Sequence, residues 1–226
     1  MTDTPSSSPS SASGSEVASP ILACVLAGGQ SRRMGGGDKT LLDLGGRSML
    51  EIILDRLRPQ AGQIVLNANG DPQRFSAYGL PVIADPVEGF KGPLAGILAG
   101  LLHARDTAPQ VTHVVSIAGD TPFFPANLIA RLTGHLPTAR PTIALASSNQ
   151  RLHPVFGLWP VALADDLADW LAAGESGKVL AWVDRHDSIE VDFADDPASG
   201  LDPFFNANRP EDLDLALKAL AETRIP

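Results

Sequence analysis

Apolar and polar positions follow two alternating patterns from Ile21 onward. Short unbroken apolar runs are typical of buried strands, and apolar residues spaced three and four apart are typical of helices with one buried face. The expected strands cover residues 21–27, 64–69, 80–85, 113–120, 142–147, 153–159 and 188–193. The expected helices cover residues 48–58, 92–104, 125–136, 162–174, 178–186 and 210–222, with Pro125 at a favourable first helical position.

The alternation of strands and helices predicts an α/β fold, with a doubly wound, mostly parallel sheet and helices on both faces. No linker-like stretch interrupts residues 20–226, so we expect them to form a single domain. In such sheets ligands bind at the carboxyl ends of the strands, near a switch in strand order. The residues that follow each expected strand are therefore the candidates for chemistry.

Residues 1–19 are rich in Ser and Pro and almost free of large apolar side chains. Such a segment cannot bury enough surface to offset the entropy of ordering it, so we expect a disordered tail. The tail has neither the cationic start and apolar stretch of a secretory signal nor the arginines of a transit peptide.

Charge and cysteine content narrow the function classes. The net charge of −9 over 226 residues argues against general nucleic-acid binding, which depends on a basic surface. The single cysteine, Cys24, excludes an intrachain disulfide and a cysteine-based zinc site, and it suits the reducing cytoplasm. No apolar run reaches the roughly 18–20 residues that a membrane helix needs. We therefore expect a cytoplasmic protein that binds neither nucleic acid nor membrane.

The stretch LAGGQSRRMGGGDKT, which begins at Leu26, combines glycines with cationic side chains directly after the first expected strand. Glycines let a backbone approach a phosphate, amide N–H groups point at its oxygens, and cations neutralise it. The stretch is not a P-loop, because Asp38 precedes Lys39, and it is not a dinucleotide fingerprint, because Gln30 stands two positions after Gly28. Its composition also suits a flexible loop with solvated cations, and its position after the first strand favours phosphate binding.

Polar residues end the next three expected strands. Asn67 and Asn69 end the second, where asparagine also favours a turn. Asp85 ends the third, where its carboxylate could accept hydrogen bonds from the N1–H and N2–H₂ edge of guanine or from a ribose, or simply occupy a turn before a proline. Asp120 ends the fourth, where it could hold Mg²⁺ beside phosphate oxygens, or cap a helix or turn.

The opening stretch resembles the signature of the molybdenum cofactor guanylyltransferase family, a MobA-like group of nucleotidyltransferases, in its order of Gly-Gly, Arg-Arg and Asp-Lys. Related cytidylyltransferases usually carry Ala-Gly where this chain has Gly28 and Gly29. The late segment DPFFNANRPEDL resembles the family's Asn-x-Asn-Thr-Pro-Glu-Asp-Leu segment, with Arg209 in place of the usual threonine. The resemblance runs from about residue 22 to the expected closing helix, and it implies a Rossmann-like nucleotidyltransferase fold.

The resemblance implies an enzyme that transfers GMP from GTP to the phosphate of molybdopterin or Mo-molybdopterin, with Mg²⁺, and releases pyrophosphate. In the family pattern the nucleotide contacts fall on Leu26, Ala27, Gly28, Gly29, Arg32, Lys39, Asn67, Asp85 and Asp120. The catalytic assignments are Lys39 at the phosphates, Asp120 at the metal, and Arg33 or Arg32 at the pyrophosphate leaving group. The acceptor side is assigned to Asn206, Asn208 and Arg151. His153 is a candidate contact on that side but not a catalytic residue.

Several alternatives stay open at this level. A molybdopterin cytidylyltransferase, or a nucleotidyltransferase with another phosphorylated acceptor, would use the same kind of loop. A nucleotide-binding regulator that has lost catalysis would not need to keep both Lys39 and Asp120. Asn208 also stands where it would cap the closing helix. The resemblance further implies transient contact with cofactor-biosynthesis or molybdoenzyme proteins, although no residue identifies them.

Overall fold

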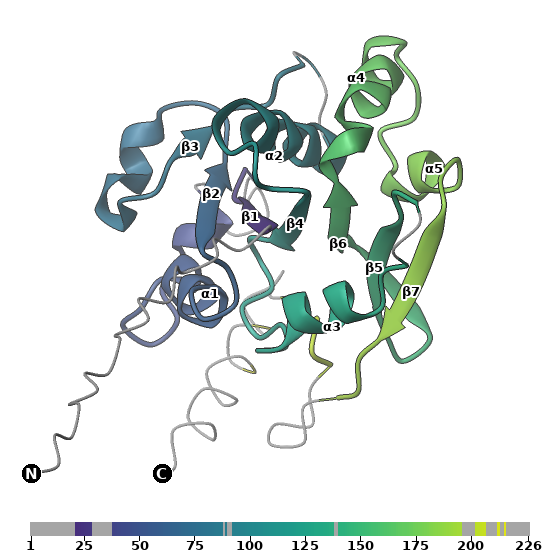
Figure 1. The fold of residues 1–226 in the computed structure, drawn as a ribbon. Helices are drawn as coiled ribbons and strands as arrows, with labels where there is room; N and C mark the ends of the chain where they lie inside the picture. The colour runs from purple at the N-terminus through teal and green to yellow at the C-terminus, as the bar shows by residue number, and fades with distance from the viewer. Residues whose placement is uncertain are drawn as a thin grey trace, which may run out of the picture.

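Seven strands form one sheet in the computed structural model, which describes residues 21–28, 38–87, 89, 92–137, 140–195, 202–206, 212 and 215. The strands lie in the order β3-β2-β1-β4-β6-β5-β7 (Figure 1). Their bounds are β1 (Ile21–Leu26), β2 (Gln63–Asn67), β3 (Val82–Ile83), β4 (His113–Ala118), β5 (Ile143–Ser148), β6 (Arg151–Pro160) and β7 (Ser188–Asp192). The expected tail, residues 1–19, lies outside the described residues.

The sheet is mostly parallel, with one reversed strand. β1 pairs in parallel with β2 and β4, β2 with β3, and β5 with β7. β6 runs antiparallel to both of its neighbours, β4 and β5. The connection between β5 and β6 is the pair Asn149 and Gln150, both with positive φ, and a tight turn of this kind joins antiparallel strands. The prediction of a mostly parallel sheet is therefore confirmed, with β6 as the exception.

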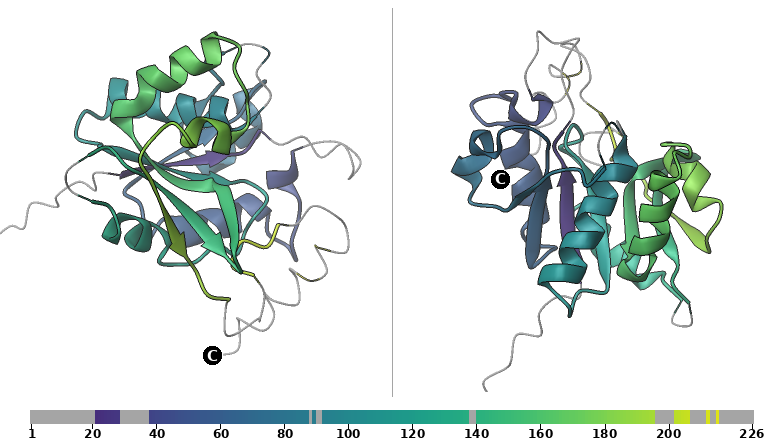
Figure 2. Two further views of the ribbon diagram at one scale, coloured as in Figure 1. Left: turned by 90° about the vertical axis from the view of Figure 1, so that its right-hand side faces the viewer. Right: turned by 90° about the horizontal axis from the view of Figure 1, so that it is seen from above.

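Helices cover both faces of the sheet (Figure 2). Helices α1 (Met49–Leu57) and α3 (Leu128–Gly134) pack on one face, and α2 (Pro93–Thr107), α4 (Ala164–Ala172) and α5 (Val179–Val183) pack on the other. Three short 3-10 helices complete the described elements: η1 (Lys39–Leu41), η2 (Pro72–Tyr78) and η3 (Val161–Leu163). Within the described part of the chain, none of the helices has both the length and the apolar character needed to cross a membrane.

β1, an interior strand of the sheet, shows how the two layers follow from the sequence. Its side chains alternate between two apolar cores: Ala23 and Val25 pack on the α1 side, while Leu22 and Cys24 pack on the α2 side. All four are buried, which explains why the segment is apolar throughout instead of alternating. Burial also raises the pKa of the Cys24 thiol to about 12, so the thiol stays protonated and behaves as a core residue.

The helix after β4 begins later than the sequence predicts. α3 starts at Leu128, so Pro125 is not a first helical residue. Carbonyl groups of the preceding loop are bound instead by α1 and the turn that follows it: Phe124 O accepts from Arg56 Nη1 at 3.3 Å, and Pro125 O accepts from Gln60 Nε2 at 3.3 Å. The expectation about Pro125 is wrong because these tertiary contacts hold the loop in a non-helical path and override the local signal.

Other elements differ in extent. The strand expected over 80–85 is reduced to the two residues of β3, at the edge of the sheet where β2 alone pairs with it. The 3-10 helix η2 was not predicted, and it starts where the Asp71 side chain accepts a hydrogen bond from Gln73 N at 2.9 Å. Of the closing helix expected over 210–222, only Asp212 and Leu215 lie among the described residues, and both are helical.

Glycines let α2 lie close to the sheet. A Cβ atom at Gly96 would overlap Asn67 Oδ1 and would lie 2.8 Å from Leu26 Cδ2. A Cβ atom at Gly100 would lie 3.0 Å from Cys24 Cβ. The distance between the helix and the sheet therefore depends on the missing side chains.

Replacing Gly96 by alanine should destabilise the protein, although alanine is the better helix former. The added methyl must displace Asn67 or lift α2 from the sheet, and overpacking of this kind costs about 1–3 kcal/mol. Gly134→Ala is the matched control, since Gly134 also lies in a helix and has nothing within 4 Å of its would-be Cβ. Urea denaturation should show a lower unfolding free energy for Gly96→Ala and an unchanged or higher one for Gly134→Ala. Wild-type stability of Gly96→Ala would contradict the close packing.

Candidate functional site

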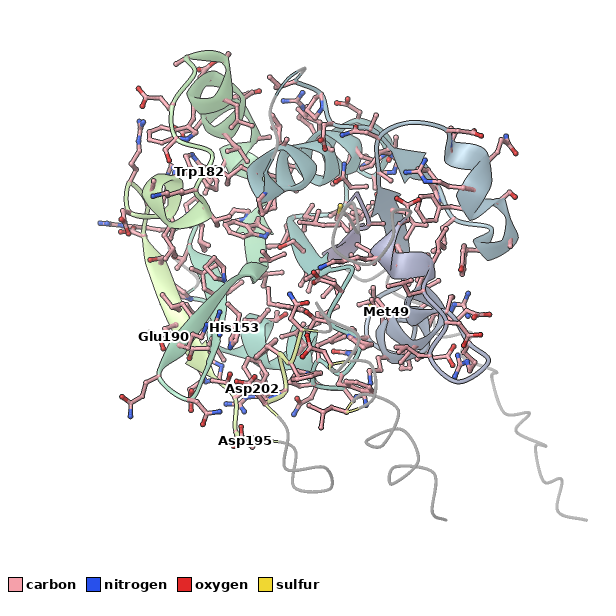
Figure 3. All side chains as sticks on the ribbon, turned by 180° about the vertical axis from the view of Figure 1, so that it is seen from behind. Met49, His153, Trp182, Glu190, Asp195 and Asp202 are labelled. Carbon is pink, nitrogen blue, oxygen red and sulfur yellow. The ribbon has the colours of Figure 1, made fainter. Side chains whose placement is uncertain are left out.

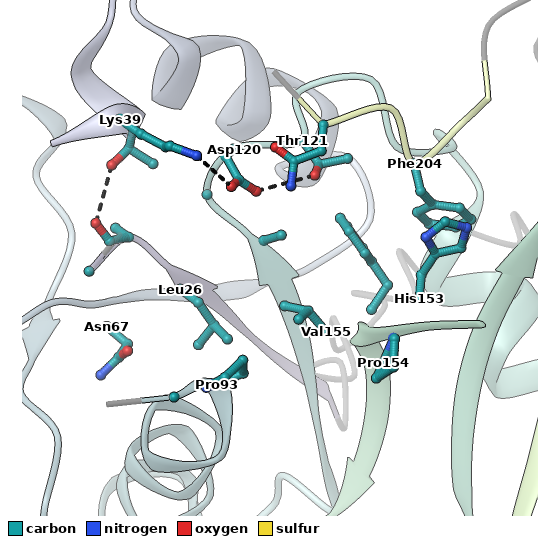
Figure 4. Close-up of a pocket in the computed structure, with 18 of the residues that line it drawn as sticks. Leu26, Lys39, Asn67, Pro93, Asp120, Thr121, His153, Pro154, Val155 and Phe204 are labelled. Carbon is teal, nitrogen blue, oxygen red and sulfur yellow. Dashed lines mark hydrogen bonds and ion pairs between the residues drawn. The ribbon is translucent and has the colours of Figure 1, made fainter. Parts of the chain in front are cut away.

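The carboxyl ends of four neighbouring strands meet at one edge of the sheet. Leu26 lies beside Asn67 on one side and beside Ala118 on the other, and Asn67 lies beside Ile83. β6 runs the opposite way, so it begins at this same edge with Arg151. A cleft of about 1130 Å³ opens here (Figure 4). Typical ligand pockets span about 300–1,000 Å³, so this cleft is somewhat larger than the usual pocket for one small ligand.

One end of the cleft carries a lysine and an aspartate from distant segments. Lys39 Nζ lies 3.5 Å from Asp120 Oδ2, and the two side chains are 17% and 25% exposed (Figure 4). Lys39 begins η1, and the next residue, Thr40, donates a hydrogen bond from Oγ1 to Ala27 O at 3.3 Å. That bond ties η1 to the end of β1. The cation and the carboxylate therefore face the same space as the backbone of Ala27 and Gly28.

Gly119 sets how closely the end of β4 approaches β1. Its backbone N–H donates to Leu26 O at 3.2 Å. A Cβ atom at this position would lie 2.6 Å from Thr40 Cγ2 and 2.7 Å from Leu26 O. Only glycine fits such an approach, because any side chain would collide with the backbone. The position of Asp120, the next residue, depends on it.

Two asparagines hold Asp85 at a second position in the cleft. Asn67 Nδ2 donates to Asp85 Oδ1 at 2.9 Å, and Asn69 Nδ2 donates to Asp85 Oδ2 at 2.7 Å. Asn69 Oδ1 also accepts from the backbone N–H of Asp85 at 2.9 Å. An ionised carboxylate has about four lone-pair sites, so Asp85 is fixed in orientation and can still accept hydrogen bonds from a ligand. Asn69, for which the sequence indicated a turn, is thus also part of the site.

The aspartates of the cleft differ in how firmly they are bound. Three of them accept hydrogen bonds of 2.5–2.9 Å: Asp38, Asp85 and Asp202. The fourth, Asp120, has only longer contacts within the described residues, 3.5 Å to Lys39 Nζ and 3.4 Å to Thr121 Oγ1. Its carboxylate is therefore the one most available to a cation. The described residues contain no group of three or more His, Cys, Asp or Glu that could hold a metal.

A hydrogen-bonded network forms the other end of the cleft, where residues 202–206 lie against β5 and β6. Ser148 is buried, and its Oγ lies 2.7 Å from His153 Nε2 and 2.9 Å from each carboxylate oxygen of Asp202. Figure 3 labels His153 and Asp202, the two partners of this hydroxyl. The rings of His153 and Phe204 stack with centroids 4.4 Å apart (Figure 4). An ionised carboxylate cannot donate, so the Ser148 hydroxyl donates to Asp202 and accepts from the Nε2–H of His153. The network fixes the imidazole and holds residues 202–206 beside the cleft.

Burial lowers the pKa of His153 below its ordinary value, and this outweighs the opposite effect of the Asp202 carboxylate. The imidazole is therefore neutral at pH 7, with its proton on Nε2 and an accepting Nδ1.

Arg151 and Asn206 line the same end of the cleft. Asn206 Oδ1 is buried and has no hydrogen-bond partner within the described part of the chain. Since an unpaired buried acceptor is costly, this oxygen is suited to a donor on a ligand.

Every sequence-predicted site residue that the structure describes lines this one cleft: Leu26, Ala27, Gly28, Lys39, Asn67, Asp85, Asp120, Arg151 and Asn206. Gly29, Arg32, Arg33 and Asn208 lie outside the described residues. The alternative of a helix cap at Asp120 is excluded, because Asn127 is the residue that precedes α3, whereas the alternative of a turn is confirmed, because Asp120 lies in the turn after β4.

Sequence reasoning missed three polar residues of the cleft wall and its support: Arg74, Ser148 and Asp202. Arg74 binds Asp38 across 36 residues, and Ser148 binds Asp202 across 54 residues. Ser148 directly follows the strand expected over residues 142–147, and Asp202 opens the segment DPFFNAN, but neither position indicates which side chain it will bind. Arg74 follows no expected strand. The roles of all three arise only when distant segments meet.

Comparison with known proteins gives consistent matches over most of the chain. Residues 23–189 match the family described as MobA-like NTP transferase domain. The chain is 52% identical over 200 residues to a molybdenum cofactor guanylyltransferase of Mesorhizobium japonicum, and the match covers 88% of this chain and 96% of that protein.

Solved structures show the same fold. The crystal structure of molybdopterin-guanine dinucleotide biosynthesis protein A from Archaeoglobus fulgidus is similar, with a TM-score of 0.68 and 26% identity, covering 89% of this chain and 99% of that chain. A Mycobacterium tuberculosis protein solved in complex with manganese is also similar, with a TM-score of 0.62 and 18% identity over 89% of this chain and 99% of that chain.

Proposed function

The chain belongs to the MobA-like NTP transferase family, and we propose that its cleft transfers GMP from GTP to the terminal phosphate of molybdopterin or of its molybdenum-loaded form. This guanylyltransferase reaction forms the molybdopterin guanine dinucleotide cofactor and releases pyrophosphate. The observation that carries the proposal is the meeting of Lys39 and Asp120, 81 residues apart in sequence, in a cleft whose wall also holds Asp85. A cation and an available carboxylate beside strand-end backbone suit a nucleoside triphosphate with its divalent cation.

GTP binds along the carboxyl ends of β1, β2 and β3 in this proposal. Backbone groups of residues 26–28 contact the nucleotide, and the Lys39 ammonium binds phosphate oxygens. Asp85, held by Asn67 at 2.9 Å, accepts hydrogen bonds from the N1–H and N2–H₂ edge of guanine or from the ribose hydroxyls. Cytosine offers no such pair of donors, so an Asp85 contact to the base would favour GTP over CTP.

Asp120 is the residue proposed to hold Mg²⁺. The fit rests on its carboxylate, which is exposed to the cleft and lacks short hydrogen bonds within the described residues. Mg²⁺ prefers one or two carboxylates together with substrate phosphates and water. When bound, Mg²⁺ neutralises charge on the triphosphate as the phosphorus is attacked. The manganese of the similar Mycobacterium tuberculosis protein supports a divalent cation on this fold.

The acceptor is proposed to bind at the end of the cleft formed by β6 and residues 202–206. The pterin carries N–H donors, and the buried Oδ1 of Asn206 is an acceptor without a partner among the described residues. Arg151 offers a cation to the acceptor phosphate from the start of β6. Asn208 belongs to the same proposal by its position in the sequence motif.

The transfer itself is an in-line displacement. An oxygen of the acceptor phosphate attacks the α-phosphorus of GTP, the bond from that phosphorus to the bridging oxygen breaks, and pyrophosphate leaves with the electron pair. The nucleophile is already anionic, so no side chain has to remove a proton. The chain contributes positioning and charge neutralisation, from Lys39 at the phosphates, Gly29 and Arg32 in the loop, and Arg33 or Arg32 at the leaving pyrophosphate.

The location and protein contacts of the enzyme are part of the same proposal. A cytoplasmic location is supported by the single cysteine, Cys24, which excludes an intrachain disulfide. Direct contact with the proteins that supply molybdopterin is supported by the lability of that cofactor.

Acceptor-dependent release of pyrophosphate tests the proposed function. The purified chain is incubated with GTP and Mg²⁺, with and without molybdopterin, and pyrophosphate and dinucleotide are measured. We expect both products in equal amounts and only when the acceptor is present. GTP binding without any release would instead identify a regulator that has lost catalysis, and it would contradict the proposal.

A further inference from the structure

Arg74 lines the cleft but has no part in the proposed reaction. It lies in η2, and its Nε donates to Asp38 Oδ2 at 2.5 Å. Its Nη2 donates to Asn69 O at 2.7 Å, and its Nη1 donates to Asp71 O. Its Cζ lies 4.6 Å from the centroid of the buried Phe75 ring. The guanidinium is therefore held by contacts along its edges and on its face, which is the geometry of a residue that fixes others in place.

The ion pair between Arg74 and Asp38 links η2 to the segment that carries Lys39. Asp38 occupies the N-cap position of η1, yet its side chain makes no capping hydrogen bond. Its carboxylate turns instead to Arg74, and the two side chains are 17% and 25% exposed. Since Lys39 follows Asp38 directly, the Asp38 carboxylate lies next to the residue that carries the ammonium group.

The ion pair also sets the charge of the wall that faces the triphosphate. An unpaired carboxylate next to Lys39 would repel phosphate oxygens and offset the charge of the lysine. Screening by solvent is weaker in a cleft than on an open surface. Arg74 neutralises Asp38, so the positive charge of Lys39 is left for the phosphates.

The same guanidinium reaches the nucleoside side of the cleft. It donates to the backbone carbonyl of Asn69, whose side chain holds Asp85 through two hydrogen bonds. Arg74 therefore connects the segment that carries Lys39 with the segment that carries Asp85.

We propose that Arg74 is a positioning residue for GTP binding, which neutralises Asp38 and so holds Lys39 ready for the phosphates. The inference rests on the proposed function, because GTP is the ligand. The inference predicts that adding Asp38→Asn to an Arg74 variant restores much of the lost GTP affinity. The asparagine amide carries no charge that Arg74 would have to neutralise. A residue that only supports the fold would lower the melting temperature of Arg74→Met and leave the Kd of the folded protein for GTP unchanged.

The test measures GTP binding to the intact chain by calorimetry in Mg²⁺ without acceptor, and then turnover with molybdopterin. Arg74→Met should raise the Kd for GTP about 10- to 30-fold and change kcat less than about 3-fold, because a charge-assisted pair is lost on the binding side. Asp38→Asn alone, and the double variant, should bind GTP within about 3-fold of wild type. Arg105→Met is the matched control, since Arg105 pairs with Asp165 at the end of α2, outside the cleft, and it should bind GTP like wild type.

Three results would overturn the inference: a wild-type Kd in Arg74→Met, a double variant that binds GTP as weakly as Arg74→Met, or a wild-type protein that does not bind GTP. Failure of the proposed function alone has a different signature. The wild-type protein would then bind GTP, and the variants would keep the expected order of Kd values, but no variant would release pyrophosphate when molybdopterin is added.

Discussion

Replacing Asp120 by asparagine is expected to lower kcat about a thousandfold, equivalent to about 4 kcal/mol of lost transition-state stabilisation, while the fold survives. Asparagine keeps the size of the side chain but removes the negative charge that a divalent cation requires. Nothing in the described structure depends on that charge for packing, because the carboxylate makes only long contacts, 3.5 Å to Lys39 and 3.4 Å to Thr121. Initial rates at saturating GTP, acceptor and Mg²⁺ measure the effect directly.

The control for this variant is Asp165→Asn, which removes the same charge from a side chain that is 87% exposed on α4. Its kcat should equal that of the wild-type protein. Thermal unfolding should place both variants within about 4 °C of wild type, corresponding to less than about 1 kcal/mol. Near-normal Mg²⁺-dependent turnover by Asp120→Asn would refute the metal assignment.

Replacing Lys39 by methionine is expected to lower kcat/KM for GTP about 100- to 1,000-fold. Methionine fills a similar volume along the cleft wall but cannot neutralise phosphate oxygens. The loss should fall on both KM and kcat, because the ammonium faces the triphosphate in the ground state and when charge moves to the leaving pyrophosphate. Steady-state kinetics with GTP as the varied substrate separate the two contributions.

Lys178→Met is the matched control for the lysine, because Lys178 is exposed at the start of α5 and does not line the cleft. It should keep the wild-type kcat/KM. The double variant of Lys39 and Asp120 should lose less activity than the product of the two single losses, since residues that act as a unit are not additive. A Lys39→Met enzyme with wild-type kcat/KM would rule out the phosphate-binding role.

The layered fold could be predicted because its signals are local. The apolar segment of β1 is buried on both faces, and burial of that kind leaves an unbroken apolar run in the sequence. Helix α1 likewise carries its own start signal, a capping box in which Ser48 and Glu51 bind each other's backbone N–H groups. Pro125 shows the limit of such signals, because the residues that redirect its segment are distant in sequence: Arg56 lies in α1 and Gln60 in the turn after it.

The sequence predicts the site residues that follow strands within motifs. It predicts less well the residues whose side chains orient them. Lys39, Asp85 and Asp120 could be placed because parallel strands bring their carboxyl ends to one edge of the sheet. The bonds from Asn69 to Asp85 and from Arg74 to Asp38 join segments 16 and 36 residues apart. The second of these contacts depends on the packing of η2 against Asp38, which no periodicity in the sequence encodes.

The preference for GTP over CTP is the central claim of the proposed function. Side-by-side turnover with GTP and with CTP, using purified molybdopterin and Mg²⁺ and following pyrophosphate and the dinucleotide product, decides it. We expect kcat/KM for GTP to exceed that for CTP at least about 100-fold, as for a site whose buried polar groups match one ligand and are left unpaired by the other. Equal turnover of the two nucleotides, or a preference for CTP, would contradict a guanylyltransferase.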